Sequence, residues 1–542
     1  MEKQTDREEK IVDNVMRLWQ QVSGGTRSLW ESHWQEIAER MIPGFSGTFL
    51  TNTRTPGEKK QEFVFDSTAS IALNRFGAIL DSLLTPANQK WHRIKTDDEV
   101  LNKNRQVQMY YEDIQRILFK QRYSPQSNFT AQNQMNFKGL GAFGTSCMFT
   151  DGHQIGRGLR YKSCHIGSIF PLENHQGIVD TVLRYFTMEA RQMAQRWGKD
   201  NLPEGVKVAL EKDPTRDFYV IHCVMPREEY DMNSVAPKDM PFASYYIAFD
   251  GKKLMEESGF NSMPYSVSRY EQYPGETLGR SPAMEVLPSS KTLNEMKKTM
   301  LKQGHRTVDP VLLAHDDGII DTFSLKPGSI NGGGISKEGR ALIQPLPVGS
   351  LSAGKDMMDE ERSIINDSFL VTIFQILVDT PQMTATEVLE RTREKGILLA
   401  PTLGRQQSEY LGPTIERELD ILAQQGLLPE MPRILQEAGG EYRVEYDSPM
   451  SRTQRAEEAT GLARTLEMTL NAVNVTGNPA PLDHFNWDVI IPELSDINAI
   501  PERWMRSQQE IAEIRQGRAE QAQRQEEIQS APGAAQVMKA IQ

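Results

Sequence analysis

The sequence predicts an α+β fold, and three patterns carry this prediction. Residues 354–428 repeat apolar side chains at spacings of three, four and seven, which is typical of amphipathic helices. Residues 159–184 and 218–273 read as short strands separated by turns. A β-rich stretch at 307–350 lies between two long helical patterns. We therefore expect a helix that leads outward, a small head and a helix that returns.

Composition indicates an ordinary globular protein. The chain has 542 residues, 38% of them hydrophobic, which is enough for about three or four domain-sized units. No apolar run approaches the roughly 18 residues of a membrane span, and residues 1–6 lack the apolar core of a signal peptide. Cys147, Cys164 and Cys223 suit neither a disulfide framework nor a zinc knuckle, so we expect a reduced compartment, the cytoplasm of the producing cell.

The N-terminal region, residues 1–60, is predicted to hold two helices and an arm. Apolar residues recur at helical spacing within 11–19 and again within 30–41, so we expect these helices to cap a core. Residues 43–60 are rich in Gly, Thr and Pro, which favours an extended loop.

Residues 61–280 are predicted to form one mixed α+β domain. Asp66 or Ser67 can cap a helix that ends before Pro86. A helical pattern at 107–121 and the strand patterns described above follow along the chain.

One run in this domain, Gly139-Leu140-Gly141-Ala142-Phe143-Gly144, matches the GxGxxG fingerprint of dinucleotide sites. That fingerprint normally follows a strand and opens a helix. Here a helical pattern at 129–138 comes first and a strand pattern at 145–149 follows. We therefore interpret these glycines as a place where a helix and a strand approach closely.

Two long helices are predicted to flank the β-rich stretch at 307–350. Residues 281–306 begin as a helix with Pro282 at its first position, and Gly304 is expected to end this helix. Residues 351–378 form the returning helix. The small head lies between them.

A third, kinked helix is predicted next. Pro381 ends the returning helix, and residues 384–387 have the form of a capping box, so a new helix begins there. Gly426 is its expected C-terminal stop. Gly404 and Pro413 would each bend or break an ordinary helix, so we expect this one to be kinked.

The remaining residues are predicted to be mostly helical. A strand-like run at 442–446 precedes a helix at 451–470. Residues 485–492 read as an aromatic turn, and Pro501 opens a final polar helix. Its narrow apolar stripe suggests packing against further copies of the chain or a partner.

The two long helices that flank the head carry opposite charge. Residues 281–306 have five basic and two acidic side chains, a net charge of +3, whereas residues 354–378 have two and five, a net charge of −3. The opposite strips can face one another within a chain or between neighbouring copies, or each face can simply be solvated. Exposed pairs contribute only about 0–1 kcal/mol each, so they would set register more than strength.

Several short motifs occur in an order that resembles the portal, or head-to-tail connector, proteins of short-tailed, podovirus-type bacteriophages. Each motif alone is weak, but their order and spacing are specific, and the resemblance covers most of the chain. The motifs are FDSTA at 65–69, LDSLLTPANQKW at 80–91, GAFGT at 141–145, GRSPA at 279–283, TVDP at 307–310, MTATEV at 383–388 and LGP at 411–413.

The resemblance implies a portal-type fold assembled as a ring, usually a dodecamer, at one vertex of the capsid. Its parts would be residues 1–60 as N-terminal helices and arm, 61–280 as the wing, 281–306 and 351–378 as the stem helices, 307–350 as the clip, 379–384 as the tunnel loop, 385–447 as the long kinked helix that returns to the wing, and 448–542 as the crown with its C-terminal helix.

Candidate DNA-channel and docking residues follow from this assignment. Four lysines cluster on the first stem helix and are candidate lumen-facing cations, although they also belong to the basic strip; they are Lys291, Lys297, Lys298 and Lys302. The resemblance adds the tunnel-loop residues Asp379, Thr380, Pro381, Gln382 and Met383 to the channel. In the clip it implies a surface that faces terminase or adaptor, made of Lys326, Asn331, Gly332, Gly333, Gly334 and Lys337.

The resemblance also implies what the ring does. Portals of this family pass double-stranded DNA inward during packaging by a separate terminase, pass it outward at ejection, and hold the tail through an adaptor. The net charge of −12 suits a channel that repels phosphate and lets DNA slide. Further implied partners are the major capsid and scaffolding proteins and internal core proteins at the crown, with no membrane. The protein would assemble in the host cytoplasm and remain in the virion.

Two other interpretations compete with a portal. An enzyme is disfavoured because the sequence lacks GxxxxGK[ST], HExxH and any nominated nucleophile-base set. Cys164, His165 and Asp180 lack a second pair at metal spacing, so we predict a structural role for them, with no metal or cofactor. Another virion ring component, a tail adaptor or an internal core protein, is the alternative, but an adaptor would not need the helix-head-helix excursion.

Overall fold

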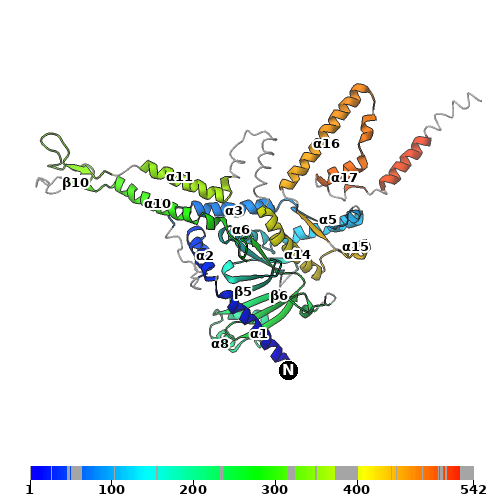
Figure 1. The fold of residues 1–542 in the computed structure, drawn as a ribbon, viewed down its shortest axis with the longest axis horizontal. Coiled ribbons are helices and arrows are strands. Elements are labelled where there is room, and N and C mark those ends of the chain that lie inside the picture. The colour runs from blue at the N-terminus through cyan, green and yellow to red at the C-terminus, as the bar shows by residue number, and fades with distance from the viewer. Residues whose placement is uncertain are drawn as a thin grey trace, which may run out of the picture.

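A computed structural model describes residues 2–25, 27–45, 49, 64–102, 104–153, 157–231, 234, 236–314, 324–347, 351–372, 401–440, 442–446, 449–478, 480–497, 500, 504–506 and 510–524. Helices and antiparallel sheets are combined in this part of the chain, which confirms the predicted α+β class. From the body, a pair of helices projects to one side and ends in a small head with two paired strands (Figure 1).

The N-terminal residues form two helices, α1 (Glu2–Ser23) and α2 (Arg27–Met41), and a 3-10 turn, η1 (Pro43–Phe45). α1 lies along a five-stranded sheet, where the Trp19 ring contacts the Phe170 ring edge-on with their centroids 4.5 Å apart. The predicted helical cap over a core is therefore confirmed.

The five-stranded sheet is antiparallel throughout and has the order β4-β5-β6-β7-β8. α1 covers one of its faces, and two short helices contribute to a second core on the sheet. The elements are β4 (Ile169–Glu173), β5 (Val179–Glu189), β6 (Asp217–Pro226), β7 (Phe242–Ala248), β8 (Lys253–Phe260), α7 (Ala190–Trp197) and α8 (Glu204–Lys212), with 3-10 turns η2 (Ile166–Ser168) and η3 (Pro237–Asp239).

A three-stranded sheet of order β3-β2-β9 and several helices surround the main core. A separate two-stranded sheet joins β1 to β12, with Ile94 opposite Val444. The elements are α3 (Thr68–Leu84), β1 (His92–Lys95), α4 (Glu99–Asn102), α5 (Arg105–Arg122), α6 (Phe129–Phe143), β2 (Thr145–Gly152), β3 (Leu159–Cys164), β9 (Tyr265–Arg269), α14 (Gly412–Gln424), α15 (Arg433–Glu437) and β12 (Arg443–Tyr446).

The GxGxxG run follows a helix and precedes a strand, as predicted, but its closest approaches are to a second helix and to Gly279. α6 ends at Phe143 and β2 begins at Thr145, with Gly144 between them in the left-handed region at φ 74°. A Cβ on Gly141 would lie 2.6 Å from the Phe76 ring, so this glycine lets α6 pack directly on α3.

The helix predicted at 281–306 is present but divided. It forms α9 (Pro282–Glu285) and α10 (Leu287–Val308), because Pro288 has no N–H to donate to the carbonyl of Met284. Gly304 does not end α10, which continues to Val308; in an exposed helix interior a glycine costs only about 1 kcal/mol. The head carries two short paired strands, β10 (Leu312–Ala314) and β11 (Ile343–Pro345).

The returning helix, α11 (Leu351–Ser368), ends earlier than predicted. Leu370 takes a φ of 62°, in the left-handed region, which costs a non-glycine residue about 1–2 kcal/mol. The turn buries both Phe369 and Val371 in the main core, and this burial offsets the cost. The predicted continuation beyond residue 372 lies outside the described residues.

The kinked helix is continuous where it is described. Residues 401–406 are α-helical, Gln407–Leu411 form a π-helical turn labelled η4, and α14 continues without a break to Gln424. Gly404 and Pro413 do not break the helix; the irregularity is the π-turn, a known cause of helix kinks. Gly426, at φ 64°, follows the end of α14 as predicted.

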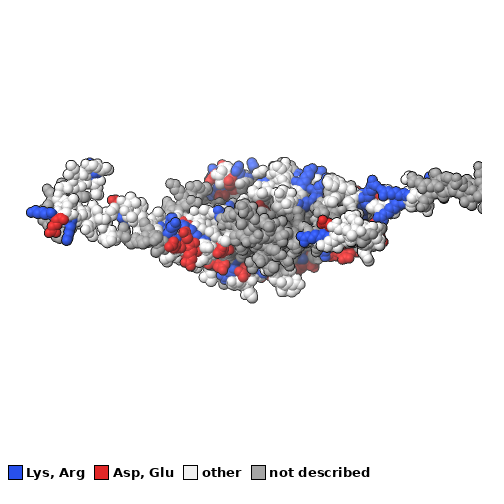
Figure 2. Space-filling view, turned by 90° about the horizontal axis from the view of Figure 1, so that it is seen from above, with Lys and Arg blue, Asp and Glu red and all other residues white. Residues whose placement is uncertain are grey.

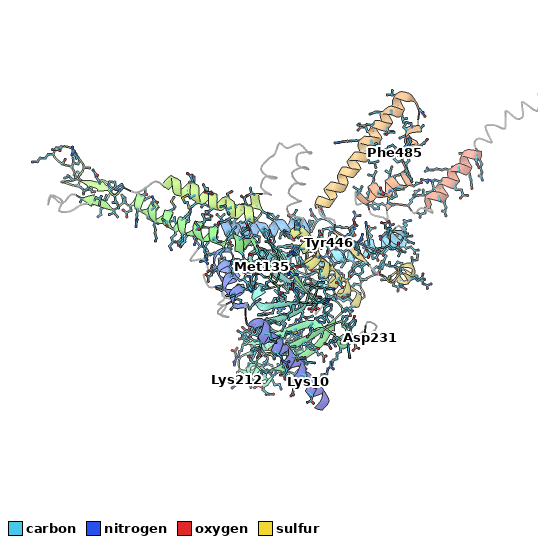
Figure 3. All side chains as sticks on the ribbon, viewed as in Figure 1. Lys10, Met135, Lys212, Asp231, Tyr446 and Phe485 are labelled. Atoms are coloured by element: carbon cyan, nitrogen blue, oxygen red, sulfur yellow. The ribbon has the colours of Figure 1, made fainter. Side chains whose placement is uncertain are left out.

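The C-terminal region is helical. α16 (Pro449–Thr476), a 3-10 turn η5 (Ala480–His484) and α17 (Trp487–Ile497) stand apart from the sheets (Figure 1). The aromatic turn predicted at 485–492 is wrong: α17 starts there, because the Asn486 side chain accepts a hydrogen bond from the Asp488 N–H and caps the helix. Residues 510–524 form a further helix. Figure 3 labels Phe485 in this region and Tyr446 in the body.

Candidate functional site

The candidate site is the helix hairpin, which we define as α9, α10, the head and α11. Its two long helices meet through apolar side chains: Leu293 of α10 and Met358 and Ile365 of α11 are buried. Gly354 of α11 leaves room for the Met300 side chain of α10, because a Cβ there would lie 2.6 Å from the Met300 sulfur. The hairpin is therefore held by packing rather than by charge.

The root of the hairpin is built from two of the motifs identified in the sequence. Ser281 caps α9 by accepting a hydrogen bond from the Met284 N–H (3.1 Å), and it donates one to the carbonyl of Ala142 (2.9 Å). A Cβ on Gly144 would overlap the carbonyl oxygen of Gly279. The GAFGT and GRSPA motifs thus lie directly against each other and fix the place where the hairpin leaves the body.

The FDSTA motif ties α11 to α3. Asp66 accepts hydrogen bonds from Thr68, from its N–H at 2.9 Å and its hydroxyl at 2.5 Å, and so replaces Ser67 as the capping side chain. Its other carboxylate oxygen accepts from Arg362 of α11 at 2.6 Å. Asn294 of α10 accepts from the Phe65 N–H at 2.7 Å. Both helices of the hairpin are thereby attached to the start of α3.

The Asp66 contact predicts how the root responds to acid. Burial alone would raise the pKa of Asp66, but hydrogen bonds from Arg362 and Thr68 outweigh it and lower the pKa. Because the pKa of Asp66 is lower in the folded than in the unfolded chain, the ionised carboxylate stabilises the fold at pH values above the unfolded-state pKa. This stabilisation is lost as the pH falls below about 4. We expect Asp66→Asn to be less stable than wild type at pH 6, with a difference that shrinks towards pH 3 in urea unfolding.

A matched control for this experiment is Asp200→Asn, which changes an exposed aspartate between α7 and α8. The free energy of unfolding of Asp200→Asn should stay close to that of wild type across the same pH range. If the Asp66→Asn difference is independent of pH, the Arg362 contact does not stabilise the ionised carboxylate.

Hydrogen bonds through Asn133 connect the LDSLLTPANQKW motif to the kinked helix. Asn133 of α6 donates to the Asp81 carboxylate (2.6 Å) and to the Thr85 hydroxyl (2.7 Å), and its carbonyl oxygen accepts from the Tyr410 hydroxyl (2.6 Å). Tyr410 lies in the π-turn, just before the LGP motif. The motifs that are far apart in sequence therefore converge on one buried polar network.

Two arginines that sequence reasoning missed hold the kinked helix through ion pairs, one partly buried and one fully buried. Arg269 pairs with Glu409 of the π-turn at 2.8 Å and with Glu173. Arg122 of α5 pairs with Glu418 of α14, and neither side chain is exposed. The partners are 140 and 296 residues apart in the chain, so no local spacing could have revealed them.

The four candidate lysines fall into different environments. Lys291 pairs with Glu36 of α2, and Lys298 lies 3.5 Å from Glu295 and 5.7 Å from the centre of the Phe65 ring. Lys297 and Lys302 make no ion pair within the described residues. Two of the four candidate lysines therefore have partners within the chain, and their predicted place in a channel stays a prediction. Asp379, Thr380, Pro381, Gln382 and Met383 lie outside the described residues.

The head exposes both polar and apolar side chains. Lys326, Gly332 and Lys337 are exposed, Gly333 and Gly334 are half-buried, and Asn331 is half-buried and exchanges hydrogen bonds with the backbone of Ser324 at 2.8 and 2.9 Å. Ile330 is 99% exposed. Figure 2 shows charged side chains at the far end of the projection. The other large apolar side chains exposed there are Val308, Val311, Leu313, Leu325, Ile335 and Leu346.

The remaining candidate ligands are cysteine and histidine side chains. Among the described residues, no group of three or more His, Cys, Asp or Glu side chains is placed to hold a metal ion. Cys147, Cys164 and Cys223 are free and buried, and His165 caps η2 by accepting from the Gly167 N–H. No helix in the described ranges is long and apolar enough to cross a membrane.

The described residues thus combine an α+β body with a projecting hairpin of paired helices that ends in a β-built head. The chain belongs to the bacteriophage head-to-tail connecting proteins, whose family model matches residues 12–505. It is 28% identical to the portal protein of Salmonella phage epsilon15 over 95% of this chain and 92% of that protein. It is also 28% identical to the probable portal protein of Bordetella phage BPP-1, over 92% and 89% respectively.

Proposed function

We propose that this chain is the subunit of a portal ring that sits at one capsid vertex, passes double-stranded DNA during packaging and ejection, and joins head to tail. The observation that carries the proposal is the projecting hairpin, together with the family match along nearly the whole chain. Such a hairpin, repeated around an axis, encloses a pore. A dodecamer is the copy number we propose.

In this ring the wing is residues 61–280, the stem is the α10–α11 pair, the clip is 307–350, the tunnel loop is 379–384 and the crown is 448–542. The exposed apolar side chains of the head support its assignment as a clip, because a partner protein bound there would cover them. Terminase during packaging and the tail adaptor afterwards are the proposed partners of the clip. The capsid and scaffolding proteins contact the rest, and assembly takes place in the host cytoplasm.

Within the hairpin, Lys297 is the best lumen-facing candidate. Lys291, Lys298 and Lys302 are separated by seven and four residues and so share one face of α10, whereas Lys297 lies off that face. The segment 379–383 completes the proposed DNA path. Charge reversal, Lys297→Glu, tests this role through the length of DNA packaged per particle. If the variant rings assemble and package full-length DNA, Lys297 does not contact the duplex.

The ring itself is tested by negative-stain microscopy of the purified full-length chain. The expected result is a flanged ring with a central hole wide enough for a duplex. A homogeneous monomer at every concentration, or a closed assembly without a hole, would overturn the proposal.

A further inference from the structure

The exposed surface of α10 is basic on the side that faces away from α11. The residues that meet α11 are Leu293, Met296 and Met300, which follow one another at spacings of three and four. Lys298 and Lys302 are displaced from that stripe, and Lys302 is exposed with no ion pair in the described part of the chain. The further basic residues toward the tip are His305 and Arg306, both exposed.

α11 has the opposite arrangement. Met358 and Ile365 face the core and α10, whereas the acidic side chains stand on the outer side of the helix. Seen from above, acidic side chains gather where the projection leaves the body (Figure 2). Asp359 pairs with Arg362 of the same helix. The exposed acidic side chains are Asp356, Asp359, Glu360 and Asp367.

These two charged faces do not meet within one chain. A hydrogen bond from Ser368 to Glu285 (3.2 Å) joins the two arms at the root, and no ion pair joins α10 to α11 among the described residues. Apolar packing occupies the space between the helices. One hairpin therefore presents a basic side and an acidic side that point in opposite directions.

We propose that the basic face of α10 in one copy docks on the acidic face of α11 in the next copy of this chain. The proposal rests on the portal ring proposed above and names its stem interface. A contact between two different faces is heterologous, and such contacts close into rings when the rotation between copies returns to the start. Each copy supplies both faces, so every interface around the ring is the same.

The axial register of the hairpin fits this docking. Met300 lies at Gly354 and Glu285 at Ser368, so positions on the two antiparallel helices are matched along the axis. Lys298 therefore stands at the level of Asp356, and Lys302 lies about 6 Å further out, within reach of a long side chain. Exposed pairs are individually weak and are screened by salt, so the contact sets the alignment of neighbours and weakens as ionic strength rises.

Charge-swap variants test the docking. Variant A is Lys298→Glu with Lys302→Glu, and variant B is Asp356→Lys with Glu360→Lys. We expect each variant alone to need about tenfold more protein than wild type for half-assembly at low salt, measured by sedimentation velocity. The chain that carries all four changes should assemble as wild type does, and so should an equal mixture of A and B, because each then meets its complement.

The control changes Lys199 and Lys212 to Glu, in the α7–α8 region; Figure 3 shows Lys212 at the bottom of the body, away from the hairpin. It should assemble normally. If A and B assemble like wild type, the docking is wrong while the ring proposal stands, since rings still form. If variants A and B assemble poorly and neither the chain with all four changes nor the mixture restores assembly, the charges do not act by pairing between copies, and the docking proposal is overturned. Thermal unfolding of each variant confirms folded subunits.

Discussion

Replacing Glu418 with alanine lowers the free energy of unfolding by about 3–5 kcal/mol, the usual cost of removing one partner of a buried ion pair. The Glu418 carboxylate accepts from Arg122 Nε at 2.9 Å and from the Tyr161 hydroxyl at 2.6 Å, and both charged side chains are fully buried. Burial alone would lower the pKa of Arg122, but Glu418 outweighs it and raises the pKa. Without Glu418 the guanidinium stays charged and unpaired.

Urea unfolding followed by circular dichroism measures this loss. Glu430→Ala, an exposed change beyond α14, is the control and should cost less than about 0.5 kcal/mol. The double variant Arg122→Met with Glu418→Leu removes both charges and should be more stable than Glu418→Ala alone. An equal or greater loss in the double variant would mean that packing, rather than the unpaired charge, accounts for the effect.

Replacing Gly144 with alanine is expected to destabilise the fold by about 3 kcal/mol or more and to loosen the root of the hairpin. Two costs combine. A left-handed φ of 74° costs alanine about 1 kcal/mol relative to glycine, and the new Cβ would overlap the carbonyl oxygen of Gly279, so the backbone of one motif must move. The same unfolding assay measures the total.

Gly177→Ala separates these two costs. Gly177 has a φ of 78°, nearly that of Gly144, but a Cβ added there would have no neighbouring atom within 4 Å. It should therefore lose only the conformational part, about 1 kcal/mol. Equal losses at Gly144 and Gly177 would show that the GAFGT and GRSPA motifs tolerate separation.

Local sequence patterns predicted most helices and strands, but not the tertiary contacts between them. The order of α10, head and α11 followed from apolar spacing and turn residues, because both are properties of neighbouring positions. Apolar spacing did not predict the division at Pro288, because a helical pattern continues on both sides of this residue. The end of α11 at Ser368 was not predictable, because burial of Phe369 and Val371 depends on the rest of the core.

The candidate site shows the same limit. Asp66 was recognised as a possible cap, but its contact with Arg362 joins residues 296 apart in the chain. The opposite charges of the two long helices were apparent by counting, whereas their placement on outward-facing sides required the helix packing. Charge composition therefore left open whether the two strips meet, and the three-dimensional arrangement shows that both face outward.

The exposed apolar side chains of the head affect how a free subunit behaves in solution. Ile330, Ile335 and Leu325 lie outside every apolar core of the described residues. A free subunit therefore exposes apolar side chains that favour aggregation. A second copy of the chain or a partner protein that covered these side chains would remove this apolar surface from water.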